Sequence, residues 1–228
     1  MPVIAAAVCP HPPIIVPELA SGAAPELDEL RAACWAAIDL LASATSILVV
    51  GSAPVSATYA ADAGGSFGPY GAPDVRIGSG TPVLPLSLSV GGWLLERSKA
   101  ADLPRSYVAV SVNEAPRQCV ELGARVAEGN ERVGLLVMGD GSARRSDHAP
   151  AHLHPRAEVF DTTVANALQD RDVEVLEALD PDLAAVLQAA GRAPWQVLAG
   201  ALKGTSLSGD LTYDAAPYGV GYFVASFT

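Results

Sequence analysis

The fold of this chain is decided at its beginning, by the stretch PVIAAAVCPHPP at residues 2–13. The run from Pro2 to Cys9 is apolar, too short for a helix and followed by Pro10, which is typical of a fully buried strand. The prolines around His11 stiffen the next loop, because a proline ring fixes its own backbone φ angle. The stretch therefore predicts a buried strand that ends in a rigid loop carrying a histidine.

Beyond this stretch, apolar runs alternate with amphipathic segments. Further strands are predicted at 46–51, 106–112, 132–139 and 218–227, and helices at 27–44, 90–99, 115–129, 157–169, 180–191 and 194–203. Continuous apolar strands separated by helices are typical of a mostly parallel sheet covered on both faces. The expected fold is a three-layer α/β domain spanning 1–228. Residues 60–81, rich in Gly, Ser, Asp and Pro, are expected to form a long loop within it.

Composition narrows the class of protein. Of the 228 residues, 50% are hydrophobic and 17% are charged, as in a folded domain with a large core. The net charge of −11, without a Lys/Arg cluster, argues against nucleic-acid binding. No apolar run approaches the 18 or so residues that a membrane helix needs, and no signal peptide is apparent.

The cysteines indicate the redox state of the cellular compartment in which the protein is expected. There are three, Cys9, Cys34 and Cys119, an odd and widely spaced set that does not suggest a disulfide framework. A reducing cytoplasm is therefore the expected location.

The histidines are confined to two loops that follow predicted strands. They are His11 in the first loop, and His148, His152 and His154 in the loop at 139–156. Ligands of open α/β sheets bind at the carboxyl ends of the strands. A metal or acid/base site formed by the two loops is one interpretation. For His152 and His154 the favoured interpretation is exposed loop residues, whereas for His11 both interpretations stay open.

Three motifs carry a resemblance to a known family. They are CPHPPIIVPEL at 9–19, GDGSARRSDHAP at 139–150 followed by HPRAEVFD at 154–161, and PYGVGYFVASF at 217–227. In this order they resemble the LigB-type superfamily, which contains the catalytic subunit of class III extradiol ring-cleavage dioxygenases and its Memo-type relatives. The resemblance covers most of the chain, and it implies a LigB/phosphorylase-like fold and a homodimer.

Enzymes of this family typically hold Fe(II) with two histidines and one carboxylate, and use a further histidine as acid/base. When the family's pattern is placed on this sequence, the first iron ligand corresponds to His11. The second falls on Pro54, the acid/base on Ala143, and the carboxylate on Arg192. Alanine and proline bind no metal, and arginine repels one. The resemblance therefore implies a retained fold whose iron site has been lost.

The expected function is thus that of a divergent LigB-like protein without ring-cleaving activity. Its strand-end cleft would bind a small molecule, such as a small aromatic ligand, or another protein, and no cofactor is expected. The residues expected to line the cleft are His11, Pro12, Ser52, Asp140, Ser142, His148 and Tyr218.

The alternative is an active class III extradiol dioxygenase or another metal-dependent enzyme. It would bind Fe(II) or Zn in a rearranged site built on His11 and His148, with oxygen ligands from Asp140 or Glu18. A purely structural or interaction protein is a third hypothesis.

Overall fold

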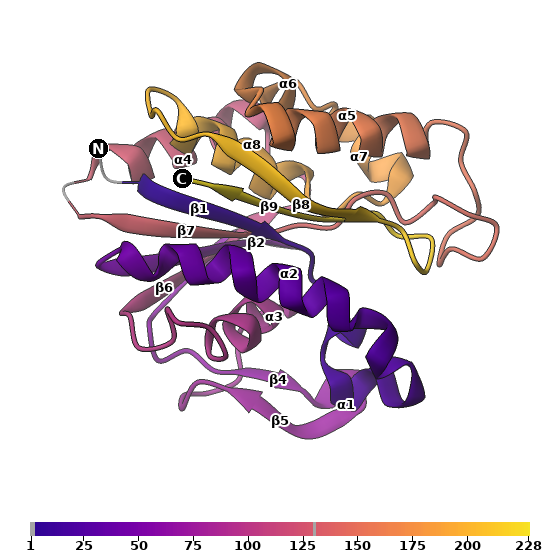
Figure 1. Ribbon diagram of the computed structural model, residues 1–228, viewed down its shortest axis with the longest axis horizontal. Helices are drawn as coiled ribbons and strands as arrows, with labels where there is room; N and C mark the ends of the chain where they lie inside the picture. The colour runs from indigo at the N-terminus through magenta and orange to yellow at the C-terminus, as the bar shows by residue number, and fades with distance from the viewer. Residues whose placement is uncertain (1–2, 130) are drawn as a thin grey trace.

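A seven-stranded sheet forms the centre of the computed structural model, which describes residues 3–129 and 131–228 (Figure 1). The strands run in the order β3-β6-β2-β7-β1-β9-β8. Their bounds are β1 Val3–Cys9, β2 Ser46–Ala53, β3 Ala57–Tyr59, β6 Arg105–Ser111, β7 Val133–Met138, β8 Gly209–Ala215 and β9 Tyr222–Phe227. The central strands β6, β2, β7 and β1 are parallel, and the outer strands are antiparallel to their neighbours. The predicted α/β fold is confirmed. Pro2, which the sequence places in the first strand, lies outside the described residues.

Helices cover both faces of this sheet. On one face lie α2 (Asp28–Asp39) and α3 (Leu86–Leu95), and on the other α4 (Pro116–Glu128), α5 (Ala157–Asp170), α6 (Val173–Glu177), α7 (Pro181–Leu187) and α8 (Arg192–Leu202), as Figure 1 shows. Short turns of helix are α1 (Pro17–Ala20), η1 (Pro13–Ile15), η2 (Ser21–Leu27), η3 (Leu40–Ser43) and η4 (Gly68–Tyr70). Among the described residues, no helix combines the length and apolar character needed to cross a membrane.

Strand β1 shows why the sheet divides the core in two. Ala5, Ala7 and Cys9 belong to the core under α2 and α3, whereas Ala6 and Val8 belong to the core under the other helices. Successive side chains of a strand point to opposite faces, and here both faces are covered. The strand is therefore apolar at every position, as the sequence indicated.

The segment at 60–81 is not a long loop, and this prediction was wrong. It contains β4 (Gly65–Phe67) and β5 (Ala72–Ile77), which form a separate antiparallel two-stranded sheet. Phe67 and Ile77 are buried in the core beside α3. Two apolar anchors and a left-handed turn at Gly71, with φ of +105°, order a segment whose composition is typical of a loop.

Several element ends also differ from the prediction. Helix α3 begins at Leu86 directly after Pro85, and α2 gives way to a 3₁₀ turn after Asp39. Helix α7 ends at Leu187 because Gln188 adopts a left-handed backbone with φ of +53°. The strands β3 and β8 and the helix α6 were not predicted from the sequence.

Helices α4 and α8 cross with their backbones in contact. A Cβ atom added to Gly123 would lie 1.9 Å from the carbonyl oxygen of Val197. One added to Gly200 would lie 2.1 Å from the carbonyl oxygen of Val120. Each helix therefore places a glycine where the other helix's main chain passes, and this crossing fixes α8 over the sheet.

Candidate functional site

The loops after β1 and β7 bring His11 and Asp140 together. The two strands are parallel neighbours with Cys9 opposite Met138, so their loops begin side by side. The backbone N–H of His11 donates to Asp140 Oδ1 at 2.7 Å. The imidazole Nδ1 lies 3.7 Å from the same oxygen, which is too far for a hydrogen bond.

His11 is the buried polar side chain of this pair. Its side chain is 9% exposed, and among the described residues Nδ1 has no hydrogen-bond partner. Buried polar atoms in native proteins are nearly always paired, so an unpaired nitrogen calls for an explanation. The pair therefore offers one unused imidazole nitrogen beside a carboxyl oxygen.

The electrostatics around Asp140 extend the site to two further residues. Burial raises the pKa of Asp140, and the neighbouring His11 partly offsets that rise. Burial also raises the pKa of Tyr222 and of Cys34, and the Asp140 carboxylate adds to both rises. Tyr222 comes from β9 and Cys34 from α2, so these two elements lie near the loops after β1 and β7.

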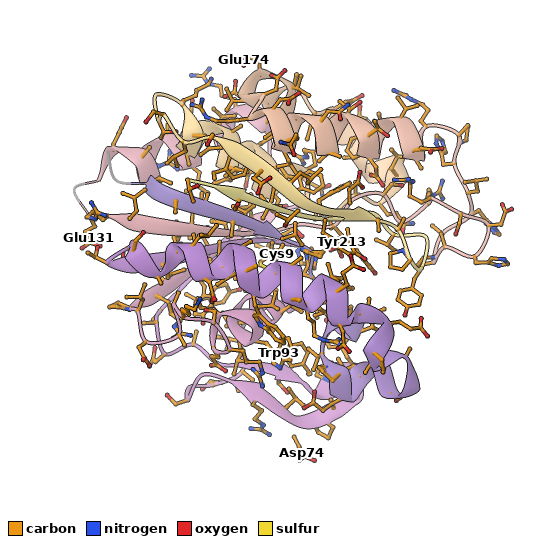
Figure 2. The ribbon with its side chains drawn as sticks, viewed as in Figure 1. Cys9, Asp74, Trp93, Glu131, Glu174 and Tyr213 are labelled. Atoms are coloured by element: carbon orange, nitrogen blue, oxygen red, sulfur yellow. The ribbon has the colours of Figure 1, made fainter. Side chains whose placement is uncertain are left out.

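The segment after His11 is held by a buried arginine of α2. Arg31 is 3% exposed and donates to the carbonyl oxygen of Ile15 at 3.1 Å. It also donates to Asp28 at 2.6 Å. Figure 2 shows Cys9, the residue two before His11, at the end of β1 between the sheet and α2. Asp140 thus holds the loop at His11 from the β7 side, and Arg31 holds the residues after it from the α2 side.

The turn at 139–142 is organised around a different carboxylate, that of Asp161. This residue of α5 is fully buried, and it accepts the N–H of Ser142 at 2.8 Å and Arg145 Nη1 at 3.0 Å. A Cβ added to Gly221 would lie 2.2 Å from Asp161 Oδ2. The turn therefore closes tightly around Asp161, and burial raises the pKa of Asp161 to about 6.

This raised pKa predicts a stability that depends on pH. The unfolded value is about 3.8, so between pH 4 and 6 the carboxyl of Asp161 binds more protons in the folded state than in the unfolded chain. The contribution of Asp161 to stability then falls as pH rises through this window. Asp161→Asn removes the titration, so its free energy of unfolding relative to wild type should rise by up to about 3 kcal/mol between pH 4 and 7.

Urea unfolding of wild type and Asp161→Asn at pH 4, 5, 6 and 7 measures this difference. Asp140 titrates in both proteins, so its contribution cancels. The control is Asp147→Asn, a change at an exposed aspartate of the neighbouring loop. Parallel stability profiles for wild type and Asp161→Asn would show that Asp161 does not titrate as inferred.

The remaining residues expected in the cleft have other surroundings. Ser142 is fully buried and its hydroxyl donates to the carbonyl oxygen of Leu187 at 3.2 Å. Ser52 and Pro12 are also buried, and the carbonyl oxygen of Ser52 accepts a bond from Ser87. Tyr218 is half-buried and donates to Glu26 at 2.8 Å.

The histidines of the second loop lie apart from His11. His148 and His152 are exposed, and His154 Nδ1 accepts the N–H of Arg156 at 3.2 Å where α5 begins. Within 3–129 and 131–228, no hydrogen bond or ion pair joins any of these three to His11. Of the residues expected to line the cleft with His11, Asp140 is therefore the one whose side chain the structure places against it. Asp161, Tyr222 and Cys34 were not identified from the sequence.

Comparisons with known proteins find the same fold elsewhere but name no activity. No family profile matches the chain. A Clostridium acetobutylicum relative, Protein CA_C1420, is 32% identical over 119 residues, which is 52% of this chain and 25% of the relative. The aligned part therefore spans about a quarter of that protein's length.

A solved structure matches almost the whole chain. It is the crystal structure of the uncharacterized protein JW3007 from Escherichia coli K12, with a TM-score of 0.57 and 12% identity. The match covers 98% of this chain and 99% of that one. The two chains share one fold. At this identity the likeness extends to the fold alone.

The side chains present do not fit the iron that the resemblance implies. In the part of the chain that the structure describes, no three His, Cys, Asp or Glu side chains gather in a way that could hold a metal ion. Pro54 is exposed after β2, and Arg192 is directed to the carbonyl oxygens of Val112 and Glu114. One imidazole and one carboxylate fall short of the three protein ligands typical of such centres.

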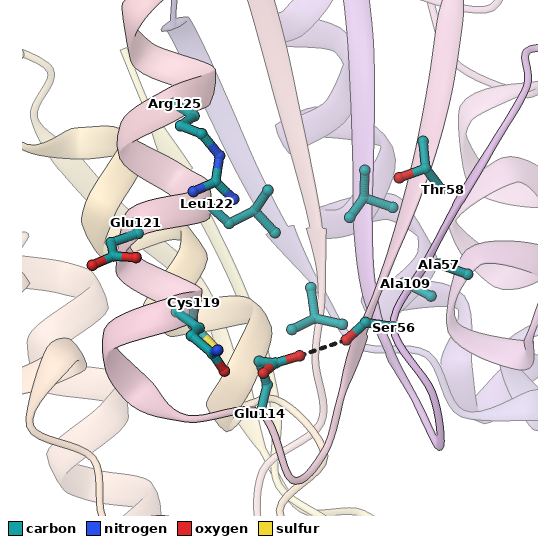
Figure 3. Close-up of a pocket in the computed structure, with 12 residues that line it drawn as sticks. Ser56, Ala57, Thr58, Ala109, Glu114, Cys119, Glu121, Leu122 and Arg125 are labelled. Atoms are coloured by element: carbon teal, nitrogen blue, oxygen red, sulfur yellow. Dashed lines mark hydrogen bonds between the residues drawn. The ribbon is translucent and has the colours of Figure 1, made fainter.

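Three cavities formed by the described residues lie away from His11. One, drawn in Figure 3, lies between α4 and the strands β6 and β3, where Ser56 donates to Glu114 at 2.7 Å; its volume is about 450 Å³. An apolar groove of about 400 Å³ runs between α5, α6 and α7. A third cavity, of about 270 Å³, lies at the carboxyl end of β6. His11 lines none of these three, which are all formed by described residues.

Proposed function

We propose that this protein is a divergent member of the LigB-type superfamily that binds a small aromatic hydroxy compound at His11 and Asp140 and does not cleave it. The three sequence motifs and the α/β fold support the family assignment. The observation that carries the binding proposal is the buried imidazole, whose Nδ1 has no partner among the described residues and lies 3.7 Å from Asp140 Oδ1.

A hydroxyl group suits this pair chemically. A hydroxyl donates one hydrogen bond and accepts others, so one group can bond both to Nδ1 and to the carboxyl oxygen. Leaving a buried polar atom unpaired costs about 1–3 kcal/mol, which a ligand recovers when it supplies the missing bond. The phenol of Tyr222 and the thiol of Cys34 lie close enough to Asp140 for its charge to raise their pKa values.

The absence of ring cleavage follows from the donor set. Iron-dependent cleavage needs a metal with open positions for both catechol and O₂. At the positions where the resemblance expects the remaining ligands, the chain has Pro54 and Arg192, and Ala143 stands where it expects the acid/base. None of the three side chains supplies a metal-binding lone pair.

Thermal denaturation with and without ligand tests the binding. Catechol at 100 times its dissociation constant should stabilise the wild type by about 2.7 kcal/mol. The dimethyl ether of catechol, which has no hydroxyl to donate, should not. His11→Ala should abolish the catechol effect, and His152→Ala, a change at an exposed histidine, should preserve it. Equal stabilisation by both compounds would contradict the proposal.

Metal analysis and oxygen uptake on the same proteins separate this function from the alternative. We expect neither near-stoichiometric Fe, Zn or Mn in the purified protein nor oxygen uptake with catechol and Fe(II) above that of His11→Ala. A tightly held metal lost in both His11→Ala and His148→Ala, with oxygen consumption, would establish the rearranged enzyme instead.

The proposal includes a cytoplasmic homodimer. Cys9, Cys34 and Cys119 are free and buried, in keeping with a reducing compartment. The dimer rests on the family resemblance, and light scattering measures it directly.

A further inference from the structure

The cavity at the carboxyl end of β6 has apolar walls and one buried charge. Its volume is about 270 Å³. Five alanines of α7, α8 and the segment between them form much of its wall, together with Val112, Asn113, Gln188 and Arg192. Small-molecule sites typically combine apolar walls with a few polar groups that fix the ligand's orientation. Here the charged group is a guanidinium.

The charge of Arg192 is buried without a carboxylate partner. The residue is 2% exposed, and it donates to the carbonyl oxygens of Val112 and Glu114 and to Gln196 Oε1. Within the described chain, no carboxylate oxygen lies within 4.0 Å of its nitrogens. Three neutral acceptors thus bind three of the five N–H groups of the guanidinium. None of these acceptors carries a negative charge that would neutralise the arginine.

One further feature adds to the positive character of the cavity, and another opposes it. Burial lowers the pKa of Arg192, which disfavours its charged form, although Cys119 and Glu114 counter this effect. The Glu114 carboxylate is bonded to Ser56 and lines the neighbouring cavity between α4 and β6 instead. The eleven-residue helix α8 also begins at Arg192, so the positive end of its dipole lies at the cavity.

We propose that this cavity binds a small carboxylate with an apolar body. The carboxylate would lie toward Arg192 and the beginning of α8, and the apolar part against the alanines. Water occupies roughly 30 Å³ per molecule, so the volume suits a ligand of about ten non-hydrogen atoms. A carboxylate accepts hydrogen bonds from guanidinium groups in the strongest geometry that proteins use.

This site is separate from the one at His11 and stands whether or not the proposed function is correct. It lies at the same edge of the sheet, because the N–H of Gly191 donates to the carbonyl oxygen of Asp140 at 2.8 Å. The strand-end edge would thus carry one site for a hydroxyl group after β1 and another for a carboxylate after β6.

Benzoate and benzamide test the proposal, because they have nearly the same shape and differ in charge. Titration followed by amide NMR should show benzoate binding at least tenfold more tightly than benzamide, with shifts at Ala185, Ala189 and Ala190. Equal affinity for the two compounds, or shifts confined to other parts of the molecule, would overturn it.

Two variants and one control complete the test. Ala185→Phe fills the cavity from an exposed position of α7, and should weaken benzoate binding at least tenfold without touching the Arg192 contacts. Arg192→Lys should retain part of the preference for benzoate over benzamide. Val159→Phe, on the exposed face of α5, should bind as wild type does. Unchanged benzoate affinity in Ala185→Phe would also overturn the proposal.

Discussion

Replacing Gly123 by alanine is expected to destabilise the protein by about 3 kcal/mol or more, at the upper end of what overpacking costs. The new methyl group would lie 1.9 Å from the carbonyl oxygen of Val197 and 2.6 Å from the amide nitrogen of Ala201. Both are main-chain atoms of α8, which cannot rotate away as a side chain can. Helix α4 or α8 must therefore shift, and α8 packs on the sheet.

Equilibrium unfolding in urea measures this loss. Gly22→Ala is the matched control, since a Cβ there meets no atom within 4 Å, and its stability should stay within about 0.5 kcal/mol of wild type. Gly200→Ala should behave like Gly123→Ala, because its Cβ would lie 2.1 Å from the carbonyl oxygen of Val120. A Gly123→Ala protein as stable as the control would show that the two helices do not cross this closely.

Replacing Arg192 by leucine is expected to cost about 3–5 kcal/mol, as for breaking a buried charged network. The guanidinium is the donor to the carbonyl oxygens of Val112 and Glu114, and to Gln196, whose amide in turn donates to the carbonyl oxygens of Glu177 and Leu179. Leucine leaves the buried Gln196 and the part-buried carbonyl oxygens of Val112 and Glu114 without this donor. The loop after β6, the start of α8 and the segment between α6 and α7 would lose their common attachment.

The control for this variant is Arg117→Leu on α4. The Arg117 side chain is 89% exposed and pairs with Glu121 one helical turn away, an arrangement worth roughly 0.3–0.5 kcal/mol. Chemical denaturation should therefore separate the two arginines by several kcal/mol. A loss below about 1 kcal/mol for Arg192→Leu would mean that water replaces the guanidinium, and that the network is not a structural requirement.

The central strands were predictable from sequence for a physical reason. Strands β1, β2 and β7 are covered on both faces, so most of their positions are apolar and the runs are visible locally. Strand β6 is apolar only in its middle, from Tyr107 to Val110, which still gives a visible run. Strand β8 lies at the edge and alternates between half-buried and exposed residues such as Asp210 and Asp214. Its pairing with β9 depends on a distant segment, and local composition conceals it.

The site was predictable only where it depends on strand order. His11 and Asp140 follow adjacent parallel strands, so the rule on carboxyl ends brings them together. Tyr222 comes from an antiparallel strand and Cys34 from a helix face, and nothing local distinguishes either from a core residue. The role of Asp161 depends on contacts between α5 and the turn at 139–142, which appear only in three dimensions.

Arg192 illustrates a limit of reasoning from resemblance. The sequence alone suggests that its charge opposes a metal. The structure shows what the side chain does instead. It joins the loop after β6 to the start of α8 and, through Gln196, to the end of α6 and the residues after it. A residue that departs from the pattern of a family that the chain resembles can thus have a structural role of its own.

The antiparallel pairing of β9 with β1 has a practical consequence. Val3 begins β1 and Phe227 ends β9, and the register places Phe227 opposite Ala6. The start of β1 and the end of β9 therefore lie on the side of the sheet opposite the loops that carry His11 and Asp140 (Figure 1). The protein can therefore be immobilised on a biosensor chip through either end, with those loops left facing the flowing analyte.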